Sequence, residues 1–499
     1  MRKNRKALLF LFLTLLSLPA LARLGGGESF SSGSSSSGGG DDIIGSIIGF
    51  IIEIIFQLWF DFVVAYPAIG VPLTLLIAAR IVYAVYFAPP ATVSQVATRY
   101  DDIPTASPPS TVGAMSSLKQ ADPNFSKPLF LDFITLLYTR VRLEAGDGTG
   151  SMSGLAGYLT PKTLAGVRKE AATGAVERVI VGAIRLQEIN VGSKLSSIAV
   201  RLETNLRRTR GATKEDLYQV EIWTFEREAG VLSKGPDELL KLACPSCGSP
   251  GELRSDGTCP YCGNVVNSGK FNWVVSSIQT LQSQPVVSLG LSTGGEERGY
   301  TWPTSPASDL SLQRRALEAR DPSFAWDAFE QRVRYIFLRL QQAWSDRDAE
   351  AIRPYETDSL FSSHLYWIEA YLAQGLQNKL ENVVLERLEV VKVEPDAYFE
   401  SITVRLWAQM KDSTVDASGI VVAGDPNVAR KFSECWTCIR RIGKHALKDA
   451  PPVDRCPSCG APLDKVGMTG ICGYCNTKIT RGDFDWVLSQ IEQPEVFVA

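Results

Sequence analysis

The chain contains the same unit twice, and this repeat limits its fold more than any other feature of the sequence. Three pairs of segments match in the same order along the chain, as Asp-Pro-x-Phe, Ser-Ile-x-Val-Arg-Leu and Phe-x-Trp-Val. The pairs are Asp122–Phe125 with Asp321–Phe324, Ser197–Leu202 with Ser401–Leu406, and Phe271–Val274 with Phe484–Val487. Chance similarity would not keep this order. The sequence therefore predicts two tandem modules, over residues 122–240 and 321–440.

Each module begins with helical patterns and continues with β-rich runs. Apolar residues fall at helical spacing after both Asp-Pro pairs, for example Phe130, Phe133 and Ile134. Shorter helical patterns follow over Pro161–Glu170 and Asp358–Leu372. The β-rich runs of the second module are Asn382–Val393, Phe399–Met410 and Arg430–Ile439. Helices before antiparallel strands predict an α+β fold, a curved sheet with helices over one face.

Eight of the ten cysteines form four Cys-x-x-Cys pairs, two pairs after each module. They are Cys244, Cys247, Cys259 and Cys262 in the first group, and Cys456, Cys459, Cys472 and Cys475 in the second. This spacing is typical of a zinc ribbon, in which four thiolates hold one Zn²⁺ and leave no open coordination position. We expect two structural zinc ions, in a ribbon over residues 241–285 and in a second over 441–499, which also holds a C-terminal strand or helix. A redox dithiol, disulfides and an iron–sulfur cluster are the competing interpretations.

Cys435 and Cys438 form a fifth Cys-x-x-Cys pair, but the repeat argues against a metal there. They align with Ile222 and Phe225 of the first module, within a β-rich run. No second pair is left to complete a four-cysteine site. We therefore expect both to be small buried hydrophobic residues.

The N-terminal part of the chain has the patterns of a membrane anchor. Residues 1–22 read as a signal peptide, with basic residues, an apolar run and Ala20-Leu21-Ala22. Residues 23–42 are Gly/Ser-rich and predicted to be disordered. Residues 62–88 are long and apolar enough for a transmembrane helix. Residues 43–60 fit an interfacial helix or a second span, and Glu53 favours the interfacial position.

Charge around this segment predicts the orientation. Asp41, Asp42 and Asp61 precede the apolar run, while Arg80 and Arg99 follow it, which places the two modules on the cytoplasmic side. Linkers are expected over residues 89–121 and 286–320. The 51 Lys and Arg against 54 Asp and Glu give a net charge of −3, and the first ribbon, Cys244–Val275, carries no basic stripe. Nucleic acid is therefore not expected as a partner.

Several motifs of the second module resemble one family. Ala343–Asp348, Ile352–Tyr355 and Glu434-x-Trp436-x-x-x-Arg440 are similar to the C-terminal domain of subunit 44 of the translocase of the inner membrane (TIM) and its bacterial relatives. The bacterial proteins also look similar in their Gly/Ser tract, their single span near Tyr66–Leu73 and their zinc ribbons. The first module matches this pattern less fully, since its Trp-Ser-Asp-Arg segment is replaced by a Gly-rich stretch.

The resemblance implies the fold and the location in more detail. It implies a cone-shaped half-barrel of the nuclear transport factor 2 kind for each module. It implies a single-pass protein of the bacterial inner membrane, and a binding function directed at membrane lipid or a protein partner.

One strand of the second module is the candidate ligand-binding face. Ile402, Val404, Leu406 and Met410 alternate with Thr403, Arg405 and Trp407, so the aliphatic set shares one side of the strand. We expect this side to be concave. Two interpretations stay open, an apolar pocket for an acyl chain or peptide and a core filled by the protein's own side chains.

A membrane-anchored, non-enzymatic binding protein is the leading functional interpretation, with lipid, an apolar ligand or a protein partner as its target. An adaptor in protein translocation or membrane-protein assembly is one alternative. An enzyme with a carboxylate and a histidine inside the cone is the other. Only two histidines occur in the chain, and His364 is the one within a module. We expect it to be a helix-surface or satisfied core residue.

Overall fold

The computed structural model describes residues 109–145, 152, 155–211, 213–250, 253–254, 256–285, 298–444, 454–494 and 497. All of them belong to one compact unit. The predicted signal peptide, Gly/Ser tract, interfacial helix and transmembrane helix (1–22, 23–42, 43–60 and 62–88) lie outside the described residues, as does most of the first linker. Within the described ranges, no helix has both the length and the apolar character to cross a membrane.

The first module contains helices followed by four strands. Its elements are α5 (Pro109–Ala121), α6 (Lys127–Ala145), the 3₁₀ helix η1 (Leu155–Tyr158), α7 (Pro161–Ala171), β1 (Ala175–Val191), β2 (Leu195–Arg210), β3 (Thr213–Glu228), the short α8 (Pro236–Leu239) and β4 (Val274–Pro285). The strands form one antiparallel sheet in the order β1-β2-β3-β4.

The second module repeats the main helices and strands in the same order. Its elements are η2 (Arg298–Thr301), α9 (Leu310–Arg320), α10 (Trp326–Asp346), α11 (Ala349–Ile352), η3 (Arg353–Tyr355), α12 (Asp358–Ala373), β5 (Gln377–Pro395), β6 (Phe399–Val415), β7 (Val421–Arg441), η4 (Leu463–Lys465) and β8 (Val487–Glu492). Of these, η2 and α11 are additional elements, and η4 takes the place of α8. The sheet order is β5-β6-β7-β8. The predicted α+β class is confirmed, and the predicted helices at residues 161 and 358 begin where expected.

The cysteine-rich ribbons are inserted into the modules instead of following them. Each ribbon lies between the third and fourth strand of a sheet, and the chain returns from it to pair β4 with β3 and β8 with β7. The expected boundaries at 240 and 440 therefore cut through the sheets. A glycine marks each return: Gly269 and Gly482 have φ of +83° and +71°, and a Cβ there would lie 3.2 and 3.0 Å from the Cα atoms of Arg227 and Arg440.

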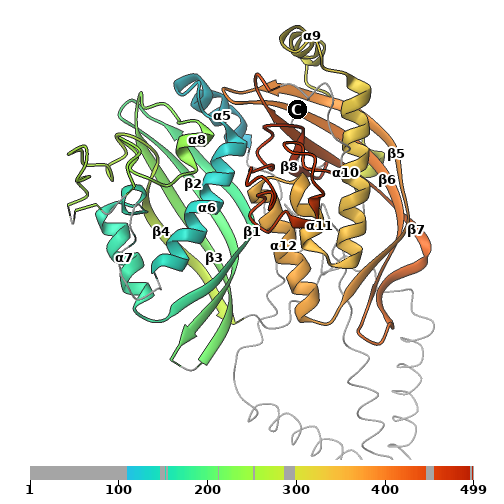
Figure 1. The fold of residues 1–499 in the computed structure, drawn as a ribbon, viewed down its shortest axis with the longest axis horizontal. Coiled ribbons are helices and arrows are strands. Elements are labelled where there is room, and N and C mark those ends of the chain that lie inside the picture. Colours follow the sequence, from blue (N-terminus) through green and yellow to red (C-terminus); the bar gives the residue numbers. More distant parts are fainter. Residues whose placement is uncertain are drawn as a thin grey trace, which may run out of the picture. The chain divides into compact units, whose positions relative to one another are not determined.

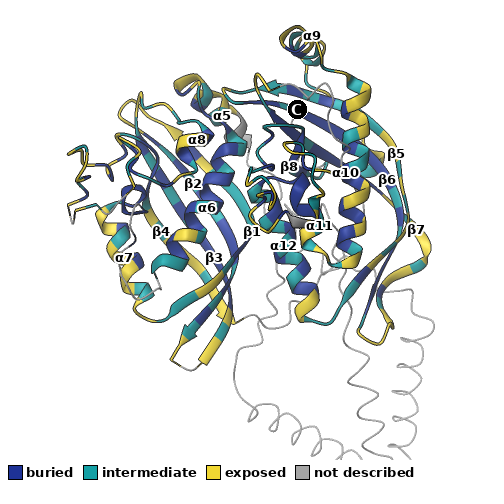
Figure 2. Ribbon diagram, in the orientation of Figure 1, coloured by how far each residue is buried: buried dark blue, intermediate teal, exposed yellow. Residues whose placement is uncertain are grey.

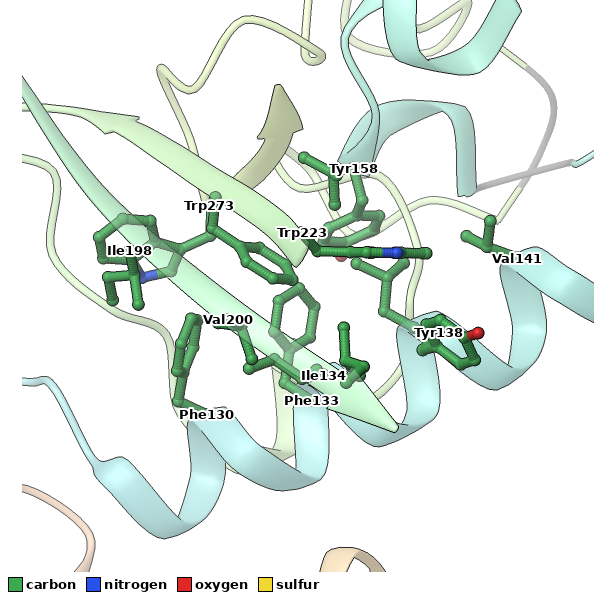
Figure 3. Packing of buried hydrophobic residues seen from close by; sticks show 14 of the residues in the cluster. Phe130, Phe133, Ile134, Tyr138, Val141, Tyr158, Ile198, Val200, Trp223 and Trp273 are labelled. Carbon is green, nitrogen blue, oxygen red and sulfur yellow. The ribbon is translucent and has the colours of Figure 1, made fainter. Parts of the chain in front are cut away.

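The helix after each Asp-Pro pair covers one face of its sheet. In Figure 1, α6 crosses the first sheet and α10 crosses the second. Figure 3 shows Phe130, Phe133 and Ile134 of α6 directed at Val200 of β2 and at Trp223. These five side chains are at most 3% exposed. The helical spacing read from the sequence thus places one apolar stripe of α6 in the core.

The repeated motifs meet in one buried cluster in each module, which we call the Asp–Arg–Trp cluster. In the first, Arg227 of β3 donates to Asp122 at 2.7 Å and lies 4.3 Å from the ring centroid of Trp273. The second holds Arg440, Asp321 and Trp486, at 2.6 Å and 4.7 Å. All six residues are at most 5% exposed. Because a buried ion left without its partner is costly, each cluster ties the start of a module to its third and fourth strands.

Part of the predicted linker 286–320 is ordered on the outer face of the second sheet. Arg405 donates to the carbonyl oxygens of Gly299 at 2.7 Å and Trp302 at 2.9 Å, and Trp407 donates to that of Tyr300 at 3.2 Å. This strap, residues 298–307, covers the face opposite α10. The first described helix of each module, α5 or α9, also lies within a predicted linker.

The four candidate pocket residues lie in the packed interior. Ile402, Leu406 and Met410 are 0% exposed and Val404 is 2% exposed, in a core shared with Phe337 of α10. Buried residues, dark blue in Figure 2, extend along β6. A cavity large enough for a water molecule would leave part of the surface of these side chains accessible. The packing therefore favours the interpretation of a core filled by the protein's own side chains.

Replacing Val404 with Trp tests the filled core. Overpacking should lower the free energy of unfolding by about 1–3 kcal/mol, as measured by denaturant unfolding of the full chain. The equivalent Val200→Trp change in the first module, where Val200 is 0% exposed, is the matched control and should cost a similar amount. An unchanged stability of the Val404→Trp variant alone would indicate open space in the second module.

Candidate metal centres

The eight ribbon cysteines gather into two groups of four. In each group the four sulfur atoms all lie within 4.8 Å of one another, and these are the only such groups of potential metal ligands among the described residues. The Sγ–Sγ distance is 3.9 Å for Cys247–Cys259, 3.9 Å for Cys456–Cys475 and 4.0 Å for Cys459–Cys472. The cysteines are free thiols, because a disulfide would require about 2.05 Å.

The turns that carry the sulfurs have one backbone geometry, used four times. The residue after the second cysteine of each pair has a positive φ, which is why it is Gly or Asn: Gly248 at +74°, Gly263 at +71°, Gly460 at +73° and Asn476 at +56°. Its N–H donates to the carbonyl oxygen of the first cysteine at 2.8–2.9 Å. This turn brings both thiols of a pair to one side.

Local donors stabilise thiolates at two of the positions. A side-chain hydrogen bond from Thr477 lowers the pKa of Cys475 to about 6. Burial raises the pKa of Cys259, but hydrogen bonds that include the N–H of Cys262 lower it more, to about 6. In contrast, burial raises the pKa of Cys244 and of Cys456 to about 12. Each group thus combines a ready thiolate with a thiol that needs a cation nearby to ionise.

These groups fit zinc. Four thiolates at about 2.3 Å from a Zn²⁺ ion lie about 3.8 Å apart in a tetrahedron, close to the observed 3.9–4.0 Å. The ribbons have few other stabilising contacts, since the core of the second consists of Cys456, Val466, Cys472 and Ile479. A metal ion would supply much of the folding energy of such a small unit.

Cys435 and Cys438 lie on β7, away from the metal groups. Both are at most 1% exposed, and burial raises the pKa of Cys438 to about 12. Cys438 packs in the core of the second module. The expectation that they are buried strand residues is confirmed.

His364 is a buried residue with a hydrogen-bond partner, which is the second of the two roles expected for it. Its Nδ1 atom lies 2.6 Å from an Oε atom of Glu356, and the two residues are 5% and 0% exposed. Glu356 was not identified from the sequence. The signal was available, because Tyr158-Leu159-Thr160 aligns with Tyr355-Glu356-Thr357.

The same alignment gives a direct comparison between the modules. Glu356 and His364 occupy the positions of Leu159 and Val167, which are 0% and 4% exposed. Thr160 and Thr357, the next residues, donate to Val275 and Leu488 of the equivalent strands at 3.0 and 2.9 Å. The second module therefore holds a buried titratable pair where the first holds two aliphatic side chains. His445 lies outside the described residues.

Comparison with known proteins identifies one part of the chain. Residues 310–448 match the Tim44-like domain. The chain is also similar to a solved structure of an "Ntf2 like protein involved in plasmid conjugation". The match covers 73% of this chain and 96% of that protein's chain, with 8% sequence identity and a TM-score of 0.14. A TM-score this low supports no conclusion about the fold. No curated protein matches the sequence.

The metal content of the purified full-length chain tests the two centres. Elemental analysis should give two zinc ions per chain, and the Cys456→Ser/Cys459→Ser double variant should hold one and unfold its second ribbon more easily. The Cys435→Ala/Cys438→Ala variant is the control and should keep two. Iron, or a wild-type content of zero, one or three zinc ions, would contradict this assignment.

Proposed function

We propose, from the match of residues 310–448 to the Tim44-like domain, that this chain is a membrane-associated adaptor without enzymatic activity. Its two modules bind a protein partner at the membrane surface, in protein translocation or membrane-protein assembly. The family match carries the proposal. The two zinc ions are structural, because all four ligands of each group are cysteine thiolates and no coordination position is left for a substrate.

The packing of the second module favours a protein partner over an enclosed lipid. A lipid acyl chain needs an apolar cavity, whereas the face with Ile402, Val404 and Leu406 is covered by α10. Exposed apolar side chains lie elsewhere, for example Leu338 on α10 at 49% and Val428 on β7 at 60%. Surface contacts of this kind suit a protein partner.

The location follows from the sequence and from the thiols. We place the chain in the bacterial inner membrane by one span over residues 62–88, with the modules in the cytoplasm. Zinc thiolates persist in a reducing compartment, and the flanking charges agree with this orientation. Activity of a periplasm-specific reporter fused after Ala499 would contradict it.

Native mass spectrometry of the full-length chain extracted in mild detergent tests the adaptor. We expect a second protein at fixed stoichiometry. A photo-crosslinking residue at the exposed Leu338 should capture the same protein, and one at the equivalent position in α6, Thr139, shows whether the first module also contacts it. Co-purification of lipid alone, without any protein, would contradict the adaptor and favour a lipid-binding protein.

A second candidate function is an enzyme, and the Glu356–His364 pair is the observation that favours it. A carboxylate that holds the Nδ1 side of an imidazole is the arrangement of a general acid–base pair. The pair is closed from solvent, however, with 5% exposure at His364, and a catalytic base must reach its substrate. An adaptor needs no access to it.

The reactivity of His364 distinguishes the two functions. In the native chain, diethyl pyrocarbonate should modify His364 at least tenfold more slowly than in the urea-unfolded chain, as followed by peptide mass spectrometry. The Glu356→Leu/His364→Val variant, which copies the first module, should still bind the partner. Rapid modification of His364 in the native chain would favour the enzyme.

A further inference from the structure

The helix α12 belongs to the second module but is held by both modules. Its buried face, including Phe361, Ile368 and Tyr371, packs in the second core. Ser359, Ser362, Ser363 and Tyr366 lie on the side that meets the first module. The backbone N–H of Val181 donates to Ser362 Oγ at 3.1 Å, and Ser363 Oγ donates to the carbonyl oxygen of Gly182 at 2.6 Å.

A glycine in β1 allows this approach. A Cβ atom on Gly182 would lie 2.7 Å from the ring of Tyr366, so a larger residue would push the helix away. The bulge between Val181 and Ala183 turns the backbone of β1 toward the serines. The contact is therefore a fitted joint between the modules.

The N-terminus of α12 is capped by a residue of the first module. In the first module, the equivalent α7 is capped by its own Thr160, which accepts from the N–H of Thr163. The corresponding Thr357 makes no such side-chain bond. Instead, Asp132 of α6 accepts from the N–H of Ser359 at 2.9 Å. A carboxyl oxygen at a helix N-terminus satisfies a free N–H group, and it accepts this hydrogen bond whether or not the group is protonated.

The charges around Asp132 come from three other elements. Asp358 is on α12, Arg353 is on η3, and Lys478 is on the second ribbon; both cations pair with Asp358. Asp132 is 7% exposed. Burial, followed by repulsion from Asp358, raises its pKa from an ordinary 3.8 to about 7, although the hydrogen bonds with Ser359 and the charge of Lys478 act in the opposite direction. Burial also raises the pKa of Asp358, but Arg353 and Lys478 lower it more, so Asp358 stays ionised.

We propose that the cap of α12 by Asp132 is a proton-dependent latch, which holds α12 against the first module when Asp132 is protonated and weakens when the proton is lost. Two adjacent carboxylates, one from each module, cannot both ionise at the joint without cost. His364, further along the same helix, pairs with Glu356, which precedes the helix, and both residues are buried. Arg178 of β1 and Glu369 of α12 form an ion pair across the joint.

The direction of the pH effect follows from linkage. Undocking returns the pKa of Asp132 from about 7 toward 3.8, so the undocked form releases the proton more easily. Docking is strongest below about pH 4, weakens as the pH rises toward 7, and changes little above about pH 8. For one group with these two pKa values, the docking constant falls about twentyfold between pH 5.5 and 7.5.

Hydrogen exchange at single amides tests the latch in the full-length, zinc-loaded chain. The amides of Ser359 and Val181 each bond across the joint, and their protection, corrected for intrinsic exchange, should fall about twentyfold from pH 5.5 to 7.5. The amides of Thr357 and Thr160 bond within their own modules and serve as controls that should not change.

Two variants separate the latch from a general effect of pH. Asp132→Asn keeps an acceptor for Ser359 but cannot ionise, so protection at the joint should become independent of pH. Ser362→Ala removes a hydrogen bond across the joint that involves no titratable group. In this variant, protection of the Ser359 amide should keep the wild-type pH dependence. Equal protection of the wild-type joint at both pH values, or an unchanged pH dependence in Asp132→Asn, would overturn the proposal. The wild-type comparison decides the matter even if Asp132→Asn fails to fold.

Discussion

The buried Asp–Arg–Trp cluster is the contact on which each module depends. Its aspartate precedes the long helix, its arginine ends the third strand, and its tryptophan begins the fourth, after the ribbon. The ribbon segment between the arginine and the tryptophan is more than forty residues long. Its two ends meet where the ion-paired arginine stacks against the indole ring. Without its aspartate, Arg227 or Arg440 would be a buried charge with no partner. The cluster therefore fixes the position at which the chain returns from the ribbon to the sheet. This explains how a metal ribbon can interrupt a sheet without changing its order.

The sequence predicted the local features of this structure well, because they depend on short-range physics. Helical periodicity placed Phe130 and Ile134 in the core, and Cys-x-x-Cys spacing gathered the metal ligands. The insertion of the ribbons was missed because β4 and β8 follow the cysteines and pair with strands far back in the chain. The strap under Arg405 was assigned to a linker, because its Pro- and Ser-containing sequence does not reveal that it binds a strand about one hundred residues further along the chain. The Asp132 cap depends on the arrangement of two modules, which no local pattern encodes.

The two modules share a fold and differ in their interiors. The first has a buried ion pair between Arg142 and Glu221 at the position where the second has Gln341, which is 1% exposed and has no hydrogen-bond partner for its side-chain amide among the described residues. The second has Glu356 and His364 where the first has Leu159 and Val167. Polar groups in a core usually lower stability unless they are hydrogen-bonded. The two modules therefore place polar groups at different positions of the same fold, each with its own local effect on stability. The first module also lacks the Trp-Ser-Asp-Arg segment, and the family match covers only the second.

The proposed adaptor function would require the surfaces of the two modules to keep a defined relation to each other. In this chain α12 contributes to that relation, because it is at once part of the second core and the partner of β1 and α6. Phe399, Ile439 and Val487 of the second module also pack in the first core. The attachment of α12 to the first module is largely polar, through serine hydroxyls, a glycine carbonyl, the Asp132 cap and the Arg178–Glu369 ion pair, whereas its attachment to the second is largely apolar. Apolar burial changes little with pH, but the polar side is sensitive to a single proton. The proposed proton-dependent contact would therefore act at the joint between α12 and the first module, outside the apolar core of either module and outside the two four-cysteine groups.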